Sequence, residues 1–207
     1  MPSGGSTRSW PSSRPDTRVR NLAGGGGIRR FAPELAGVTR SRLAPALAAA
    51  LVRHPAVNAT FTGDEIQRHP AAHVGIAVAA PQGLVVPVIR GAERLSVGEI
   101  AAARADLVQR ARDGKLTLQD LEGGTFTISN LGMYGIDRFT AVLNPPQVAI
   151  LAVGAAVERP VVSGGEVTVA PMLALTLTCD HRAIDGAEGA EFLQTLQALV
   201  ETPGLAL

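Results

Sequence analysis

The sequence contains one cysteine, one lysine, one tryptophan and one tyrosine among 207 residues, and it has no long uninterrupted apolar run. The single cysteine, Cys179, excludes an internal disulfide and is typical of proteins from a reducing compartment. A membrane-spanning helix needs about 18 or more consecutive apolar residues, and no segment reaches that length. We therefore expect a soluble, cytoplasmic protein with no membrane partner.

Acidic residues are scarce in the first part of the chain, and the remainder has a net negative charge. Residues 1–42 contain eight arginines and only two acidic residues, whereas residues 43–207 contain eleven basic and sixteen acidic residues. Residues 1–42 also have little periodic apolar sequence and include four consecutive glycines, so we expect a largely disordered basic leader. The same composition is compatible with a transit peptide, which would place the protein in the mitochondrial matrix, or with a nucleic-acid contact. We predict a flexible leader that binds no nucleic acid, followed by one domain at residues 43–207.

Helical and strand-like patterns alternate beyond residue 42. Ser96 and Glu99 have the spacing of a capping box, which predicts a helix from there to Asp113, ended by Gly114. Two further helices are expected at 43–53, where Pro45 is tolerable only in the first turn, and at 187–201. Short strands are expected at 73–80, 84–90, 125–129 and 148–154, in a pair around 163–165, and in the run that ends before residue 181. This mixture predicts an α/β layer fold.

The most informative segment is 180–186, which reads Asp-His-Arg-Ala-Ile-Asp-Gly. It connects an apolar strand-like run to an amphipathic helix pattern, which places the imidazole of His181 at a sheet edge, where a substrate can reach it. His181 is therefore a candidate general base, although a histidine at a strand end can also serve only to bind a backbone carbonyl. Asp185 and Glu188 have the spacing of a helix N-cap box. Cys179 shares a strand face with His181, which leaves a cysteine nucleophile activated by histidine as an alternative.

The other histidines do not have the pattern of a metal site. His69 and His73 have the i, i+4 spacing of zinc ligands on a helix, but Pro70 and the strand-like run after His73 are incompatible with that helix. We expect both, together with His54, to be surface or loop residues, and we expect no metal.

Two blocks upstream of the histidine turn give the segment a wider context. Residues 124–135 read Gly-Thr-Phe-Thr-Ile-Ser-Asn-Leu-Gly-Met-Tyr-Gly, and residues 144–154 read Asn-Pro-Pro-Gln-Val-Ala-Ile-Leu-Ala-Val-Gly. Together with the His-x-x-x-Asp-Gly pattern, and over about residues 44–203, the chain resembles the catalytic domain of the dihydrolipoyl acyltransferases of 2-oxoacid dehydrogenase complexes. The resemblance implies a chloramphenicol-acetyltransferase-like fold, in which helices flank a mixed sheet.

The resemblance also implies roles for individual residues. His181 would be the general base that deprotonates the thiol of coenzyme A, and Ser129 would donate a hydrogen bond to the tetrahedral oxyanion. Asp185 would organise the site without carrying a proton. The three residues that follow the serine would line the substrate channel; they are Asn130, Leu131 and Gly132.

The implied reaction is transfer of an acyl group from acyl-dihydrolipoamide to coenzyme A within a 2-oxoacid dehydrogenase complex. Residues 132–139 are closer to acetyl-transferring members than to other types, which favours an acetyl group and a pyruvate dehydrogenase complex. Lys115, the only lysine, follows a helix-ending glycine instead of lying at a hairpin tip, so the lipoyl group should come from another domain or chain.

In the family, the site lies between subunits of a homotrimer that assembles into a cubic core. The implied partners are the lipoyl domain and the decarboxylase and dihydrolipoyl dehydrogenase components. Residues 1–42 do not resemble the family's opening strand and helix, so we expect a domain that is N-terminally incomplete relative to the family. The alternative is a truncated, catalytically silent structural core of such a complex.

Overall fold

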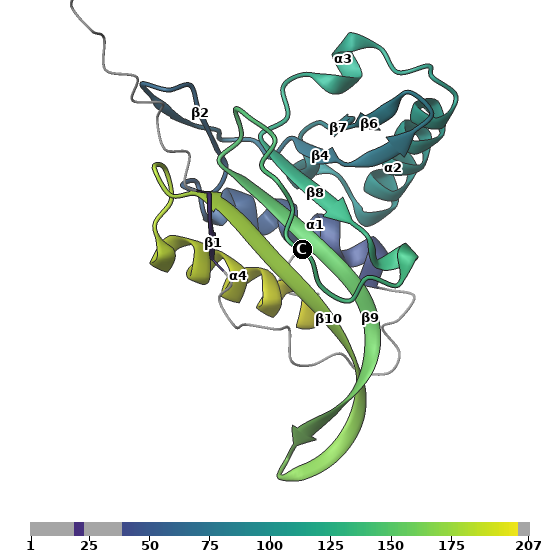
Figure 1. The fold of residues 1–207 in the computed structure, drawn as a ribbon, viewed down its shortest axis with the longest axis vertical. Coiled ribbons are helices and arrows are strands. Elements are labelled where there is room, and N and C mark those ends of the chain that lie inside the picture. Colours follow the sequence, from purple (N-terminus) through teal and green to yellow (C-terminus); the bar gives the residue numbers. More distant parts are fainter. Residues whose placement is uncertain (1–18, 23–38, 203–207) are drawn as a thin grey trace, which may run out of the picture.

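The computed structural model describes residues 19–22 and 39–202. A six-stranded mixed sheet forms the centre of the molecule, and two long helices, α1 (Thr39–Arg53) and α4 (Gly186–Glu201), pack against each other and cover one face of it (Figure 1). The order of its strands is β1 (Val19–Leu22), β10 (Glu166–Asp180), β9 (Ala149–Ser163), β8 (Phe126–Asn130), β4 (Val74–Ile76) and β7 (Val88–Ile89). The mixed α/β prediction is confirmed.

Strand β8 gives the sheet its mixed character, because it runs parallel to both of its neighbours, β9 and β4. The outer pairs, β1 with β10, β10 with β9 and β4 with β7, are antiparallel. The core lies between the sheet and the two long helices, where the rings of Phe126 and Phe192 have centroids 5.9 Å apart. Burial of this apolar layer supplies most of the driving force for the fold.

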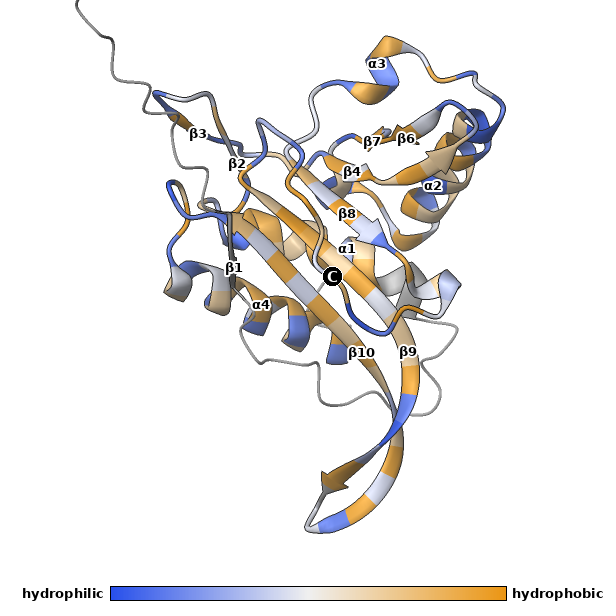
Figure 2. Cartoon of the chain, viewed as in Figure 1, coloured by the Kyte–Doolittle hydropathy of each residue, from blue (hydrophilic) through white to orange (hydrophobic). Residues whose placement is uncertain are grey.

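The hairpin of β9 and β10 is longer than the sequence patterns predict. The strands expected at 148–154 and around 163–165 merge into two strands of 15 residues each, joined by a turn at Gly164 and Gly165, which both have positive φ. The outer half of this hairpin leaves the body of the molecule as an exposed arm (Figure 1). Hydrophobic residues dominate β9 where it crosses the body and alternate with polar ones along the arm (Figure 2).

The apolar runs at 73–80 and 84–90 each divide into two strands. Their inner ends, β4 and β7, join the main sheet, while β5 (Val78–Ala80) and β6 (Gly83–Val85) form the expected hairpin beside it. The first run divides at Ala77, whose amide donates to the carbonyl of Ile128, in the middle of β8, at 2.9 Å. The hairpin therefore projects past the carboxyl end of β8.

Helix α2 (Val97–Arg112) has the predicted capping box: the Glu99 amide donates to Ser96 Oγ at 3.3 Å, and the Ser96 amide donates to Glu99 Oε2 at 2.8 Å. The chain leaves the helix through Gly114, which has a φ of 65°. The remaining elements are short and were not expected from the sequence. They are β2 (Ala59–Phe61), β3 (Ile66–Arg68), α3 (Leu118–Leu121) and two 3₁₀ turns, η2 (Ala92–Arg94) and η3 (Gly132–Tyr134).

Two expectations about the N-terminal part of the domain are corrected. Helix α1 begins at Thr39 instead of residue 43, so Pro45 lies beyond the first turn, where burial of Leu47 and Leu51 outweighs the lost backbone hydrogen bond. Residues 19–22 of the expected leader form β1, which pairs with the edge of β10 from Asp180 to Leu177. Edge pairing uses backbone groups, so it does not need apolar periodicity. The other leader residues before Thr39 lie outside the described residues.

Candidate active site

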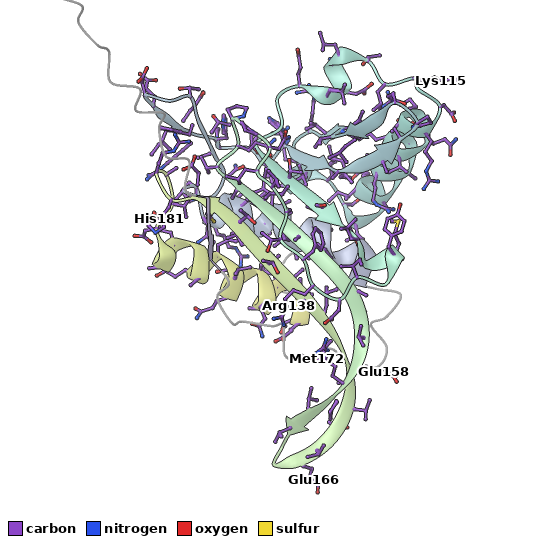
Figure 3. All side chains as sticks on the ribbon, in the orientation of Figure 1. Lys115, Arg138, Glu158, Glu166, Met172 and His181 are labelled. Atoms are coloured by element: carbon purple, nitrogen blue, oxygen red, sulfur yellow. The ribbon has the colours of Figure 1, made fainter. Side chains whose placement is uncertain are left out.

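The turn after β10 carries His181 on a rigid support. The amides of Ala183 and Ile184 both donate to the Asp180 carbonyl, at 3.0 and 3.1 Å, and Ile184 is buried in the core. His181 itself is exposed at the end of the sheet (Figure 3). Among the described residues, its imidazole has no hydrogen-bond or ion-pair partner, so both ring nitrogens are open to a ligand.

Asp185 is the N-cap of α4, as predicted. Its carboxylate accepts from the Glu188 amide at 2.8 Å, and Glu188 Oε2 accepts from the Asp185 amide at 3.1 Å. This reciprocal pair fixes the chain four residues after His181. Within the described part of the chain, no hydrogen bond joins Asp185 to His181, so the aspartate acts on the turn and not on the imidazole.

A clamp that the sequence analysis missed holds the other side of the turn. The Arg182 guanidinium donates to both oxygens of Asp180, from Nε at 2.9 and 3.1 Å and from Nη2 at 2.5 Å. The same guanidinium lies 4.3 Å above the ring of Phe61 in β2. The hydrogen bonds from Arg182 lower the pKa of the Asp180 carboxyl below its usual value, so the pair stays charged near neutral pH. His181 is thus flanked by two residues that are bound to each other.

Ser129 lies near the carboxyl end of β8 and lines a pocket of about 200 Å³. Asn130 and Leu131 line the same pocket, and Gly132 does not. Gly132 instead supports the loop: its amide donates to Asn130 Oδ1 at 2.9 Å, and a Cβ at this position would lie only 2.6 Å from the Gly154 carbonyl oxygen. Two of the three expected channel residues therefore face the pocket with Ser129, and the glycine permits the close approach of the loop to β9.

Ser129 and His181 of one chain lie at opposite ends of the sheet. Ser129 is opposite Ala152 of β9, and Ala152 is opposite Thr176 of β10, five residues before His181. With about 4.8 Å between strands and about 3.3 Å per residue, the two Cα atoms are separated by about 10 Å across the sheet and about 16 Å along it, or about 19 Å in total. No single chain brings both side chains to one substrate.

Cys179 lies in the core with 1% of its surface exposed. Desolvation is the main cause that raises the pKa of the Cys179 thiol to about 12, with smaller contributions from Asp180 and Glu188. A buried thiol that stays protonated is a poor nucleophile. The cysteine-nucleophile alternative is therefore contradicted.

The remaining histidines lie outside the helices and strands, in agreement with the expected loop positions, and they are half-buried and have structural partners. His54 Nε2 lies 2.7 Å from Thr195 Oγ1, His69 Nε2 lies 3.0 Å from Thr60 Oγ1, and His73 Nδ1 accepts from the Gly91 amide at 2.9 Å. Desolvation is the main cause that lowers the pKa of all three. Over residues 19–22 and 39–202, no three His, Cys, Asp or Glu side chains form a group that could hold a metal ion, and no helix there is long and apolar enough to cross a membrane.

A protein-family match and individual relatives identify the same kind of protein. Residues 39–207 match the family described as 2-oxoacid dehydrogenases acyltransferase (catalytic domain). The chain is 43% identical over 162 residues to the acetyltransferase component of the pyruvate dehydrogenase complex of Rickettsia felis, covering 78% of this chain. It is 46% identical over 158 residues to the succinyltransferase component of the 2-oxoglutarate dehydrogenase complex of Haemophilus influenzae, covering 76% of this chain. It spans 39% of the length of each of these relatives.

Solved structures of other acyltransferases are similar to this one. Dihydrolipoamide acetyltransferase of Azotobacter vinelandii superposes with a TM-score of 0.78 at 38% identity, over 84% of this chain and 73% of that one. That structure was used to investigate the role of three residues in the catalytic mechanism. They are a serine, a histidine 52 residues after the serine, and an asparagine four residues after the histidine. A chloramphenicol acetyltransferase matches with a TM-score of 0.51 at 13% identity, over 78% of this chain and 77% of that one. This last similarity concerns the fold alone, and it confirms the predicted fold class.

Proposed function

Because this chain belongs to the 2-oxoacid dehydrogenase acyltransferase family, we propose that it transfers an acyl group from acyl-dihydrolipoamide to coenzyme A within a 2-oxoacid dehydrogenase complex. One observation supports this more than any other. His181 follows Ser129 by 52 residues and precedes Asp185 by four, the same spacings as the serine, histidine and asparagine of the A. vinelandii acetyltransferase. This chain has an aspartate, Asp185, at the position of the asparagine, and here it caps helix α4.

His181 acts as the general base. Its imidazole takes the proton from the thiol of coenzyme A, and the thiolate attacks the acyl carbonyl. With reference pKa values near 8.5 for a thiol and 6.5 for imidazole, this transfer is uphill by roughly 2.7 kcal/mol, which a positioned base can bridge. When the tetrahedral intermediate collapses, the carbon–sulfur bond to the dihydrolipoyl arm breaks, and the imidazolium returns the proton to the departing sulfur.

Ser129 donates its hydroxyl hydrogen to the oxygen that becomes negative in the intermediate, and Asn130 and Leu131 line the approach to it. A donor of this type stabilises the transition state more than the bound substrate. Since Ser129 and His181 are about 19 Å apart in one chain, the serine must work with the histidine of another copy.

The proposed assembly follows from this composite site. We propose a homotrimer, arranged further into a cubic core, on the analogy of a solved cubic core of the pyruvate dehydrogenase multienzyme complex that is 35% identical to this chain. A lipoyl domain, a decarboxylase and a dihydrolipoyl dehydrogenase are the proposed partners, with the lipoyl group on another domain or chain. The proposed compartment is the cytoplasm, or the mitochondrial matrix if residues 1–42 include a transit peptide. The proposed chemistry uses no metal ion.

The acyl group is proposed to be acetyl, on the resemblance of residues 132–139 to acetyl-transferring members. Relatives of both acetyl and succinyl type occur at similar identity, from 41 to 48%. Rates with acetyl- and succinyl-dihydrolipoamide at equal coenzyme A concentration test the proposal, and a higher kcat/KM with the succinyl donor would overturn it.

The decisive experiment is acyl transfer from acetyl-dihydrolipoamide to coenzyme A by the full chain and its His181→Ala variant. The wild type should transfer, and the variant should be slower by about 10²-fold or more while keeping its melting temperature, because an exposed general base contributes to rate and not to packing. A wild-type protein that assembles but gives no coenzyme A-dependent transfer would instead support the silent structural core.

A further inference from the structure

The β2–β3 hairpin lies beside the turn that carries His181, and its one aromatic residue makes a contact there. The ring of Phe61, in β2, lies 4.3 Å from the guanidinium of Arg182. Arg182 directly follows His181 and is bound to Asp180, the residue that directly precedes it. No hydrogen bond or ring contact joins Phe61 to His181 among the described residues, so an effect of the ring on the imidazole would pass through Arg182.

The ion pair of Arg182 with Asp180 is by itself a weak restraint on the turn. The side chain of Arg182 is 48% exposed, whereas that of Asp180 is 14% exposed. Water and salt compete for an exposed guanidinium, so surface ion pairs hold their geometry poorly. A cation over an aromatic face has a second attraction, and stacking also limits where the planar guanidinium can lie. The ring of Phe61 supplies this second contact.

Backbone hydrogen bonds connect both sides of the stack to one segment of the chain. The Phe61 amide donates to the Pro146 carbonyl at 2.7 Å. Two residues further on, the Val148 amide donates to the Ala59 carbonyl at 3.1 Å, and the Asp180 amide donates to the Val148 carbonyl at 2.8 Å. The same short segment therefore fixes the strand that carries the ring and the end of the strand that leads to the histidine.

The ring of Phe61 is also restrained on its own hairpin. It is half-buried and packs against the main hydrophobic core. Its neighbour Thr60 has its Oγ1 atom 3.0 Å from His69 Nε2, and Asn58 Nδ2 donates to the His69 carbonyl at 2.8 Å. A side chain that is already restrained loses little further freedom when it contacts Arg182. The ring is thus a fixed surface for the guanidinium.

We propose that Phe61 is a positioning residue for His181: its ring holds the Arg182 guanidinium against Asp180, which fixes the backbone on both sides of the histidine. This inference rests on the proposed function, in which the imidazole of His181 is the base. A base must lie within hydrogen-bond reach of the thiol, and a displacement of about 1 Å can remove much of the rate. Phe61 contacts no reacting atom in this role, so its loss should lower kcat and leave KM nearly unchanged.

The test compares two substitutions of Phe61. Phe61→Leu keeps an apolar side chain and removes the aromatic face, whereas Phe61→Tyr keeps the face. The matched control is Ile66→Ala, which removes apolar surface from the directly opposite residue of the same hairpin and leaves the ring in place. Acetyl transfer to coenzyme A gives kcat and KM for both substrates, and a thermal melt shows that each variant folds. Phe61→Met takes the place of the leucine variant if that one does not fold.

Phe61→Leu should lower kcat by about 3- to 10-fold, as loss of a partly exposed cation–π contact does, with KM for both substrates within about two-fold of the wild type. Phe61→Tyr and Ile66→Ala should both keep kcat within about two-fold. A tyrosine variant as slow as the leucine variant would overturn the proposal, because the aromatic face would then be irrelevant. A rise in KM for coenzyme A at unchanged kcat would also overturn it, because Phe61 would then bind the substrate.

A double-mutant cycle shows whether the ring acts through the arginine. Once Arg182→Met has removed the guanidinium, Phe61→Leu has no stack left to disturb. The double variant should therefore be as slow as Arg182→Met alone, within about two-fold. Independent effects would multiply, so a double variant that is slower by the product of the two factors would contradict the proposal.

Hydrogen exchange of the turn gives a readout that needs no catalysis. The Arg182 amide donates to the Asp180 carboxylate at 3.1 Å, and the amides of Ala183 and Ile184 donate to its carbonyl. These amides should exchange about 3- to 10-fold faster in Phe61→Leu than in the wild type, and Ile66→Ala should not change them. Unchanged exchange in the leucine variant would refute the positioning role even in an active protein. Faster exchange in a chain that transfers no acyl group would refute the proposed function and keep the role of the ring in holding the turn.

Discussion

The separation of Ser129 and His181 predicts that two inactive variants regain activity when they assemble together. His181→Ala removes the base and keeps the serine, and Ser129→Ala removes the oxyanion donor and keeps the histidine. If each site takes its histidine from one subunit and its serine from a neighbour, some sites of a mixed assembly contain both groups. A site within one chain would never contain both.

The expected gain can be calculated from the geometry of the site. In a random assembly of equal amounts, a site is intact when its histidine comes from a Ser129→Ala subunit and its serine from a His181→Ala subunit. Each condition holds for about half of the sites, so about a quarter are intact, and the mixture should show about a quarter of the wild-type kcat. Either variant alone should retain about one percent or less. Because about 19 Å separates the two residues in one chain, a side-chain rearrangement within one chain cannot restore activity in the mixture.

The assay uses the two variants with different affinity tags, expressed together and purified through both tags, with acetyl transfer to coenzyme A as the readout. A matched control combines wild-type subunits with the Ser129→Ala, His181→Ala double variant. A composite site predicts about a quarter of the wild-type activity in this control, whereas a site within one chain predicts about a half. The reasoning fails if the doubly tagged mixed assembly is no more active than either variant alone.

Three further predictions concern the turn, the core thiol and the edge strand. Arg182→Met should lower kcat by about 10-fold or more with little change in KM, because the ion pair of Arg182 with Asp180 positions His181. The control is Arg159→Met, which breaks an exposed ion pair of the arm and is measured in the same kinetics and thermal melts. Cys179→Ala should leave kcat within about two-fold and lower the free energy of unfolding by about 1 kcal/mol, and a large loss of kcat would restore the nucleophile interpretation. A variant that begins at Leu43 should melt several degrees lower because it lacks β1 and the first turn of α1; an unchanged melting temperature would show that the edge strand contributes nothing.

Local patterns predicted the parts of the fold that depend on neighbouring residues. The two predicted capping boxes, at Ser96 and at Asp185, form as expected, because each needs only two side chains three residues apart. The 15-residue lengths of β9 and β10 were not predicted, since the arm exposes residues that would end a strand in a compact domain. The early start of α1 was missed for a related reason: Pro45 disfavours a longer helix locally, and only tertiary burial outweighs it.

Some contacts of the candidate site could likewise be predicted from local sequence, and others could not. Asp180 and Arg182 are two residues apart, so their ion pair could have been inferred from the sequence, whereas the stacking of Arg182 on Phe61 joins positions 121 residues apart. Arg104, Val108 and Arg112 share a helix face that periodicity reveals, but the sequence does not show that this face lines the same pocket as Ser129. What local reasoning could not supply is the set of long-range contacts that decide which surfaces face each other.

The distance between His181 and Ser129 is a fixed property of the sheet. His181 follows directly from β10, and the antiparallel ladder of β10 with β9 determines where that strand ends. A slip of one residue would turn Leu177 and Cys179 out of the core and bring polar residues in, so the register is held by the whole buried face. A conformational change within one chain therefore cannot bring the two groups together. If His181 and Ser129 act in one reaction, catalysis depends on assembly, and a variant that weakens subunit contacts should lose activity in proportion to its dissociation even with both residues intact.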